Sequence, residues 1–165
     1  DAAATPLLVL DHLAQTMLFP LLLPFLAAHG VHNTLRLLLD QLPRMIHRDT
    51  QHAFDGDRRA QVLVMQGLDK AWDYQLLPIQ RVFILLVLEH AEVLDWQNIS
   101  IERYQLLLGA QPESDRRLFE GFLDYAEQHQ RVIARFGRFP HRNLVLNRPS
   151  TDEEMDFLLE PGSRF

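Results

Sequence analysis

The chain has 165 residues, of which 47% are hydrophobic, and its 22 acidic and 16 basic residues give a formal charge of −6. This length and composition are typical of one globular domain and exclude disordered, collagen-like and coiled-coil proteins. The basic residues are scattered along an acidic chain, which argues against nucleic acid or a membrane as partners. Because the chain has no cysteine, disulfides, thiolate nucleophiles and thiolate metal sites are excluded, and a cytoplasmic location is favoured.

The chain opens with Asp1 rather than Met, and neither an intact start nor a secretory signal can be read in residues 1–6. Residues 7–28 are rich in leucine, but polar residues interrupt the first part and Pro20 and Pro24 break the second. The remaining apolar run is too short to span a membrane. We therefore expect a buried or kinked helix here and no membrane anchor.

Elsewhere, hydrophobic residues recur at helical spacing, and the alternation and turn signals of strands are missing. In the first half, the predicted helices span residues 31–39, 57–70 and 79–94. Pro43 either kinks the first helix or begins a new turn over residues 43–48, and residues 49–56 form a polar connector. The helix over 79–94 is so densely apolar that we expect it to be central and buried on most sides.

In the second half, a helix over residues 100–108 is closed by Gly109, and the longest helix, over 112–136, ends at Gly137. Thr151 and Glu154 form a capping box that opens a short helix through Leu159. The expected core stripe of the longest helix consists of Leu118, Phe122, Tyr125, His129, Val132, Ile133 and Phe136. The sequence thus predicts one all-α domain over residues 1–165, with six to seven helices arranged as stacked hairpins or as an irregular bundle.

Three motifs carry a family resemblance. They are LDQLPRMIHR (39–48) with Ala53 and Phe54, His90-Ala91-Glu92, and FGRFPHRN (136–143) with Ser150, Thr151 and Glu154. Over residues 37–165 the chain resembles a bacterial family of tetratricopeptide-repeat-like helical proteins of unknown function, whereas residues 1–30 match it weakly. The family usually has Phe, Asn and Ser where this chain has Leu42, Met45 and Ala91. The resemblance implies an all-helical, tetratricopeptide-like fold and implies no reaction.

Four polar residues follow the longest helix, in a loop that Gly137 and Pro140 force to turn: Arg138, His141, Arg142 and Asn143. The guanidinium groups of Arg138 and Arg142 can bind a carboxylate or a phosphate with two nitrogens each. Alternatively, these cations complement the carbonyl end of the preceding helix and have a structural role.

Asp40, Arg44 and His47 share one helix face if the helix continues through Pro43, and Arg48 lies beside them. Asp40 and Arg44 would then form an ordinary ion pair between successive turns. In the functional alternative, Asp40 orients an arginine or histidine toward a pocket. We include Asp40, Arg44, His47 and Arg48 with the loop residues Arg138, Arg142 and Asn143 as candidate ligand contacts.

His90 and Glu92 are placed near the end of the most apolar helix, where each polar side chain needs a partner. Two residues apart on one helix, they would point about 200° from each other and could not bind one metal ion. We expect no metal site and no cofactor. His29, His32, His12, His52 and His129 lack an acidic companion and are expected to be structural.

Three functions remain open. The favoured one is a binding module that holds the acidic group of a small molecule or a peptide terminus. The second is an enzyme in which His141 or His90 acts as general acid or base and Asp40 or Glu92 orients it. The third is a structural scaffold for protein–protein interaction, in which the motifs form a buried polar network. The sequence indicates neither the oligomeric state nor the ligand.

Overall fold

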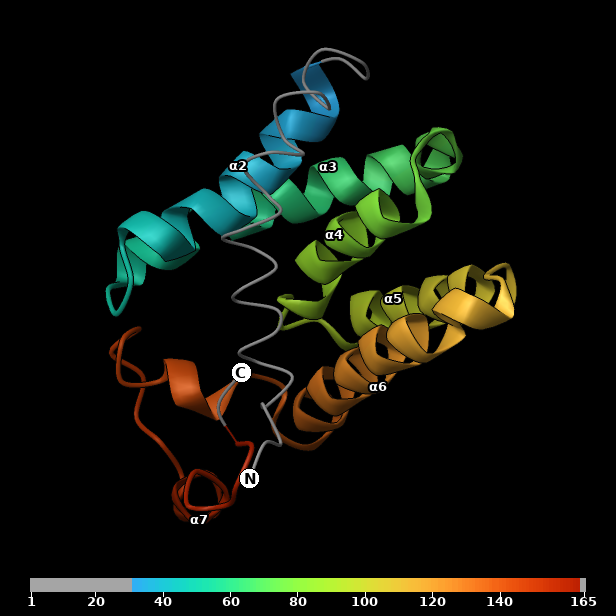
Figure 1. The fold of residues 1–165 in the computed structure, drawn as a ribbon. Coiled ribbons are helices and arrows are strands. Elements are labelled where there is room, and N and C mark those ends of the chain that lie inside the picture. Colours follow the sequence, from blue (N-terminus) through green and yellow to red (C-terminus); the bar gives the residue numbers. More distant parts are fainter. Residues whose placement is uncertain (1–30, 164–165) are drawn as a thin grey trace.

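The computed structural model describes residues 31–163, with side chains from residue 39 onward (Figure 1). The leucine-rich segment 7–28 lies outside the described residues. The α-helices are α2 (Val31–Ile46), α3 (Asp57–Asp69), α4 (Pro78–Glu89), α5 (Leu94–Gly109), α6 (Glu113–Phe136) and α7 (Asp152–Phe157). Three short 3-10 helices connect them: η1 (Gln51–Phe54), η2 (Trp72–Gln75) and η3 (Pro140–Arg142).

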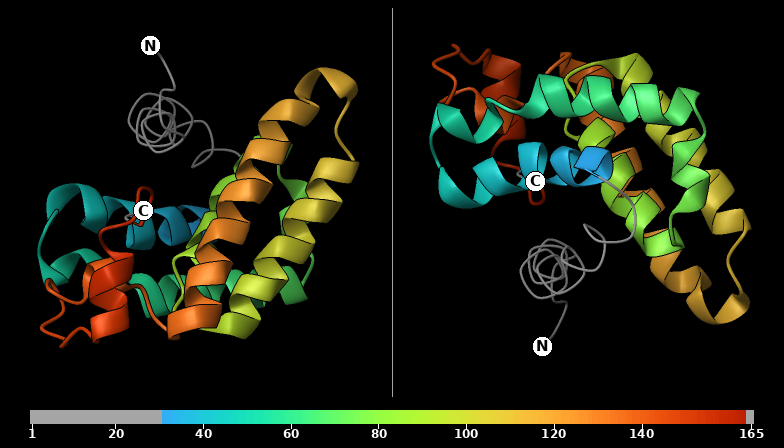
Figure 2. Two further views of the ribbon diagram at one scale, coloured as in Figure 1. Left: turned by 90° about the horizontal axis from the view of Figure 1, so that it is seen from below. Right: turned by 90° about the horizontal axis from the view of Figure 1, so that it is seen from above.

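Each helix from α2 to α6 packs against the next one along the chain, and α4 also contacts both α2 and α6. The helices α5 and α6 run side by side in both views of Figure 2. Residues 82–89 of α4 are all buried, so α4 is the central helix, as its composition predicts. Burial of a large aliphatic side chain contributes about 1.5–3 kcal/mol, and α4 supplies seven of the buried hydrophobic core residues.

After α6 the chain folds back, so that η3 lies against residues from η1 and α3. The guanidinium of Arg142 is 5.1 Å from the ring centre of Phe54 and 3.9 Å from the carboxylate of Asp57. A second apolar cluster of Val132, Ile133 and Phe139 anchors this C-terminal part to the end of α6. The fold thereby brings three distant segments, 40–57, 89–92 and 138–154, to one end of the helix stack (Figure 1).

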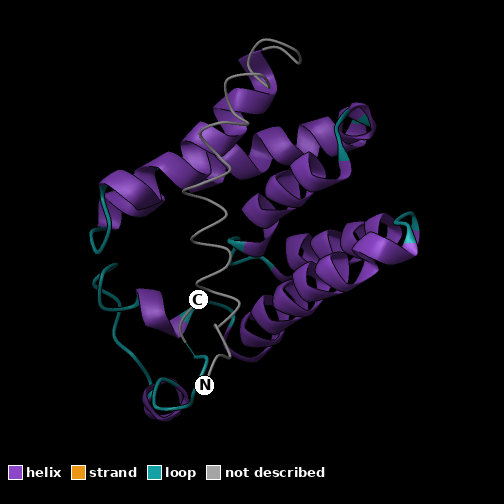
Figure 3. Ribbon diagram, in the orientation of Figure 1, coloured by secondary structure: helices purple, strands orange, loops and turns teal. Residues whose placement is uncertain are grey.

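The all-α prediction is confirmed: the part of the chain from 31 to 163 is built from helices and loops and contains no strand (Figure 3). The helix bounds of α3 and α6 match the sequence prediction closely. Thr151 and Glu154 form the predicted capping box, with the hydroxyl of Thr151 accepting from the amide of Glu154 at 3.2 Å. None of the helices in the described part is long and apolar enough to cross a membrane.

Pro43 neither ends α2 nor begins a new helix, because α2 continues to Ile46. A proline at 43 removes the N–H that would bind the carbonyl of Leu39 one turn earlier. Gly56 packs directly against this carbonyl, and a Cβ atom at position 56 would lie 2.0 Å from the oxygen of Leu39. The predicted end of this helix at Leu39, and the alternative of a new turn that begins at Pro43, were therefore wrong.

The predicted end of the helix over 79–94 and the predicted start of the helix over 100–108 were wrong, since α4 ends at Glu89 and α5 begins at Leu94. The side-chain amide of Gln97 donates to the carbonyl oxygens of Glu89 and Ala91, at 2.6 and 2.8 Å, and so satisfies carbonyls near the end of α4. On α6, Leu118 is 48% exposed and not a core residue as predicted, and the core position belongs to Phe119.

Candidate functional site

The first feature of the site is a hydrogen-bonded pair of side chains, Asp40 on α2 and His90 at the end of α4. The Nδ1 atom of His90 lies 2.9 and 3.0 Å from the two carboxylate oxygens of Asp40, which is fully buried. Arg44 Nη1 approaches Oδ1 of Asp40 at 3.1 Å, and Gln41 donates to Oδ2 at 2.6 Å. Burial raises the pKa of Asp40, but these neighbours outweigh burial and lower the pKa from 3.8 to about 2. Asp40 is therefore an ionised carboxylate at neutral pH.

Burial lowers the pKa of His90, and the charge of Asp40 offsets this only in part, so the neutral imidazole is favoured at neutral pH. A carboxylate can only accept, so the proton of the neutral ring lies on Nδ1 and Nε2 is left with its lone pair. No described residue hydrogen-bonds to Nε2, and the side chain is 14% exposed. This arrangement can accept a proton at Nε2.

Arg44 is held by two carboxylates. Its Nη1 and Nη2 atoms donate to the two oxygens of Asp57 at 2.7 and 2.8 Å, and Nη1 also donates to the carbonyl of Asp40 at 2.9 Å. Asp57 begins α3 and was not among the residues singled out in the sequence. An acidic residue in the first turn of a helix is ordinary, so nothing local marked it as the partner of Arg44.

Arg142 is coordinated differently. Its Nη1 donates to the carbonyl of His90 at 2.9 Å, while the carboxylate of Asp57 is 3.9 Å away. The guanidinium lies 4.3 Å from the ring centre of Phe139 and 5.1 Å from that of Phe54, and the residue is 7% exposed. Its buried Nε atom makes no hydrogen bond with the described residues. Burial, followed by the charge of Arg44, lowers the pKa of Arg142 to about 10.

Glu92 joins the turn after α4 to the C-terminal part. Arg148 donates to its two carboxylate oxygens at 2.6 and 2.9 Å, and the amide of Phe139 donates at 2.8 Å. Burial raises the pKa of Glu92, but Arg148 and Phe139 outweigh it and lower the value overall. Arg148 was missed in the sequence because it belongs to none of the three motifs.

Glu154 joins α7 to the loop after α6. Arg138 donates to its two oxygens at 2.6 and 2.7 Å, the amide of Thr151 donates at 2.8 Å, and Asn143 contributes a longer bond of 3.3 Å. Asn143 also accepts from Arg148 at 3.1 Å. The hydrogen bond from Arg138 is the main cause that lowers the pKa of Glu154 to about 2. Arg138 and Asn143 thus have partners within the chain.

The candidate residues therefore divide into three groups. Asp40, Arg44, His90 and Arg142 form one cluster, whereas Glu92, Arg138 and Asn143 lie in the adjoining network of Arg148 and Glu154. His47 and Arg48 are exposed after the end of α2, and the ring of His47 lies 5.8 Å from that of His52. His141 is half-buried, with its ring 5.6 Å from that of Phe139.

Behind His90 lies a buried acid that the sequence analysis did not consider. Glu89 is 1% exposed, and its Oε1 makes a short hydrogen bond with the hydroxyl of Tyr104. The Nδ1 atom of His129 lies 3.9 Å from Oε2 of Glu89, and the rings of His129 and His90 are 6.4 Å apart. Burial raises the pKa of Glu89 to about 8, although the bond to Tyr104 opposes the rise.

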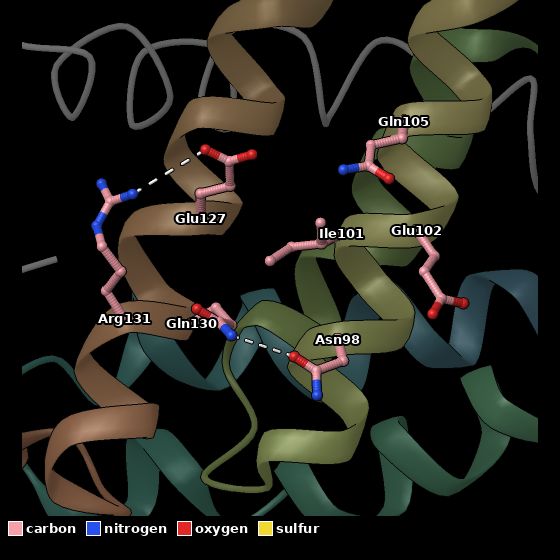
Figure 4. Close-up of a pocket in the computed structure, with 7 residues that line it drawn as sticks. All are labelled: Asn98, Ile101, Glu102, Gln105, Glu127, Gln130 and Arg131. Atoms are coloured by element: carbon pink, nitrogen blue, oxygen red, sulfur yellow. Dashed lines mark hydrogen bonds and ion pairs between the residues drawn. The ribbon is translucent and has the colours of Figure 1, made fainter.

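Two further features lie away from this cluster. An open groove of about 510 Å³ is lined by residues of α5 and α6, which pack against each other. The hydrogen bond from Gln130 to Asn98, at 3.2 Å, crosses this groove (Figure 4). None of the candidate residues lines this groove. Over the described part of the chain, no three His, Asp or Glu side chains are placed to hold a metal ion together.

The comparisons with known proteins identify a family. A family model described as "Bacterial protein of unknown function (DUF924)" matches residues 29–162, and the chain therefore belongs to this family. The chain is also similar to a solved structure of a protein of unknown function from Agrobacterium tumefaciens. The two are 32% identical over 92% of this chain and 78% of the other, with a TM-score of 0.68. No curated protein matches the chain. The expected membership of a bacterial, all-helical family of unknown function is thus confirmed.

Proposed function

We propose that the chain is a binding module that holds the carboxylate or phosphate group of a small molecule or peptide terminus at Arg142, beside His90. The observation that carries the proposal is the coordination of Arg142. This buried guanidinium makes one hydrogen bond within the described part of the chain, to a backbone carbonyl. Three neighbouring arginines, Arg44, Arg138 and Arg148, each bind one carboxylate with two nitrogens.

A guanidinium has five N–H donors in a planar fork that matches a carboxylate or a phosphate. Burying such a cation with few acceptors is costly, so an anion that supplies acceptors and negative charge is stabilised there. The rings of Phe54 and Phe139 hold the guanidinium plane before a ligand arrives, which reduces the entropy lost on binding. A tetratricopeptide-like stacking of α2 to α6 is part of this proposal, as the frame that presents the site.

The test is thermal unfolding with phosphate, acetate, succinate and a short peptide with a free C-terminus, for wild type and Arg142→Met. A ligand at a hundred times its Kd adds about 2.7 kcal/mol to the free energy of unfolding. For a domain of this size each kcal/mol raises the Tm by about 2–4 °C. We expect such a shift in wild type and its loss in Arg142→Met.

The matched control is Arg131→Met, because Arg131 is an arginine on α6 with a 61% exposed side chain and only a long ion pair of 4.0 Å. This variant should keep both its stability and its response to the anion. An Arg142→Met chain that is unfolded without ligand, together with no shift in wild type, would assign Arg142 to the structural network and contradict the proposal.

A further inference from the structure

We infer that Nε2 of His90 is a general base that takes a proton from water or a hydroxyl group of a molecule whose anionic group is bound at Arg142. Asp40 is the positioning residue of this pair. The inference rests on the proposed function, because the bound anion is what places the reacting hydroxyl beside His90. The site would then act on small carboxylates or phosphates that also carry an exchangeable proton.

The geometry of Asp40 and His90 supports this role. Both carboxylate oxygens lie within 3.0 Å of Nδ1, which fixes the ring and its tautomer. The partner carboxylate is fully buried, whereas the His90 side chain is 14% exposed. A buried carboxylate behind an imidazole stabilises the imidazolium that forms when Nε2 accepts a proton.

Arg142 is held directly against His90, since its Nη1 donates to the backbone carbonyl of that residue. An anion on the remaining donors of Arg142 would therefore be bound next to the imidazole. The O–H bond of the hydroxyl breaks, its electron pair stays on oxygen, and the proton forms a bond to Nε2.

The charged and titratable groups around the imidazole come from each element packed against it. Asp40 and Arg44 face it from α2, Arg142 from η3, and His129 from α6, while Glu89 precedes it on α4. Asp40 favours the imidazolium, whereas Arg44 and Arg142 oppose it. Burial is the largest influence and, together with the two arginines, lowers the pKa of His90, so the ring is neutral near neutral pH.

The test is labelling of unprotonated imidazole nitrogen by diethyl pyrocarbonate, followed by mass spectrometry. The exposed residues His47 and His52 serve as standards within the same chain. We expect His90 to be labelled along with them in the free protein, and to be protected by phosphate or succinate, whichever binds, while His47 and His52 are not. In Arg142→Met the protection of His90 should be lost.

Two results would overturn the inference. In the first, His90 stays unlabelled at reagent concentrations that label both standards fully. In the second, calorimetry shows that an anion binds through Arg142, but the labelling of His90 does not change. This result would contradict the role of His90 and would leave the anion site at Arg142 supported. Calorimetry measures anion binding and therefore tests the proposed function, whereas labelling tests the role of His90. A failure of anion binding is thus distinguished from a failure of the inference.

The role of Asp40 is tested by nitrogen-15 NMR of the histidine rings. In wild type near neutral pH we expect a proton on Nδ1 of His90 and none on Nε2, and the reverse tautomer would overturn the inference. In Asp40→Asn we expect slower labelling of His90 and a downward shift of the pH midpoint of labelling. The downward shift follows because the carboxylate that stabilises the imidazolium is gone. The tautomer in wild type decides the question even if Asp40→Asn fails to fold.

Discussion

The hydroxyl of Tyr104 donates a short hydrogen bond to Oε1 of Glu89 in the core between α4 and α5. The hydroxyl of Tyr104 has a single hydrogen, and it lies 3.0 Å from the carbonyl of Val82, which can only accept. The hydroxyl therefore has two acceptors, Oε1 of Glu89 and the carbonyl of Val82, for its one hydrogen. Burial raises the pKa of Glu89 to about 8, while the bond from Tyr104 opposes the rise.

Glu89→Gln should change the pH dependence of stability. The pKa of Glu89 is raised from 4.5 in the unfolded chain to about 8 in the folded one, so its contribution is fully present below pH 4.5 and is lost as the pH rises to 8. The slope approaches about 1.4 kcal/mol per pH unit. Urea unfolding from pH 5 to 8 should show wild type losing stability relative to Glu89→Gln, which keeps an oxygen that can accept from Tyr104 and cannot ionise.

The control for this prediction is Glu120→Gln, because Glu120 is exposed on α6. Its difference from wild type should stay constant over the same pH range. Parallel curves for wild type and Glu89→Gln would contradict the raised pKa of Glu89.

Asp40→Ala should cost about 1–3 kcal/mol of unfolding free energy at pH 7, because it removes the buried hydrogen-bond acceptor of His90 and one of the two carboxylates that hold Arg44. Asp55→Ala is the matched control, since it removes a carboxylate with a 67% exposed side chain that also pairs with a histidine, His52. It should cost no more than about 1 kcal/mol. Equal losses in the two variants, measured by urea unfolding, would show that the buried pair contributes little.

The same pair also gives acid sensitivity. The pKa of Asp40 is lowered from 3.8 to about 2, so its contribution is present above pH 3.8 and is lost as the pH falls toward 2. Wild type should therefore lose stability between pH 4 and pH 2 more steeply than Asp40→Ala does.

The parts of the fold that the sequence predicted are those with local signals. Pro112 and Gly137 bound α6, and Gly137 has the left-handed backbone, with φ of 68°, that its position predicted. The end of α4 carries no such signal, because its carbonyls are satisfied by Gln97 from the next helix. A boundary fixed by a contact between helices cannot be predicted from local spacing.

The site follows the same division. The spacing of Asp40 and Arg44 predicted their pairing, which the structure shows at 3.1 Å. His90 is 50 positions away from Asp40, so only the folded chain brings the two together. Arg138 and Glu154 were each singled out for separate reasons, as a loop cation and as a capping residue, and nothing in their spacing indicated that they bind each other.

Arg148→Met should loosen the C-terminal part without changing anion binding directly. The change leaves the half-buried carboxylate of Glu92 with fewer donors, which costs about 1–3 kcal/mol. Because Glu92 also accepts from the amide of Phe139, hydrogen exchange at that amide should become faster. Arg135→Met is the control, since its pair with Glu153 is exposed, and the exchange at Phe139 should then stay as in wild type.

Two glycine variants should separate backbone strain from packing. At Gly137 a Cβ atom would meet nothing within 4 Å, so Gly137→Ala should lower the free energy of unfolding only through the strain of the left-handed backbone, by about 1 kcal/mol. At Gly56 the Cβ atom would lie 2.0 Å from the carbonyl oxygen of Leu39, so α2 and α3 must move apart. We expect Gly56→Ala to cost about 3 kcal/mol by urea unfolding.

The glycine at 56 also connects packing to the site, because Leu39 immediately precedes Asp40. Movement of α2 away from α3 in Gly56→Ala should lengthen the contact between Asp40 and His90, whereas Gly137→Ala should leave it intact. The nitrogen-15 signals of the His90 ring report this contact. If these signals stay unchanged in a folded Gly56→Ala chain, the close approach at Gly56 does not set the position of Asp40.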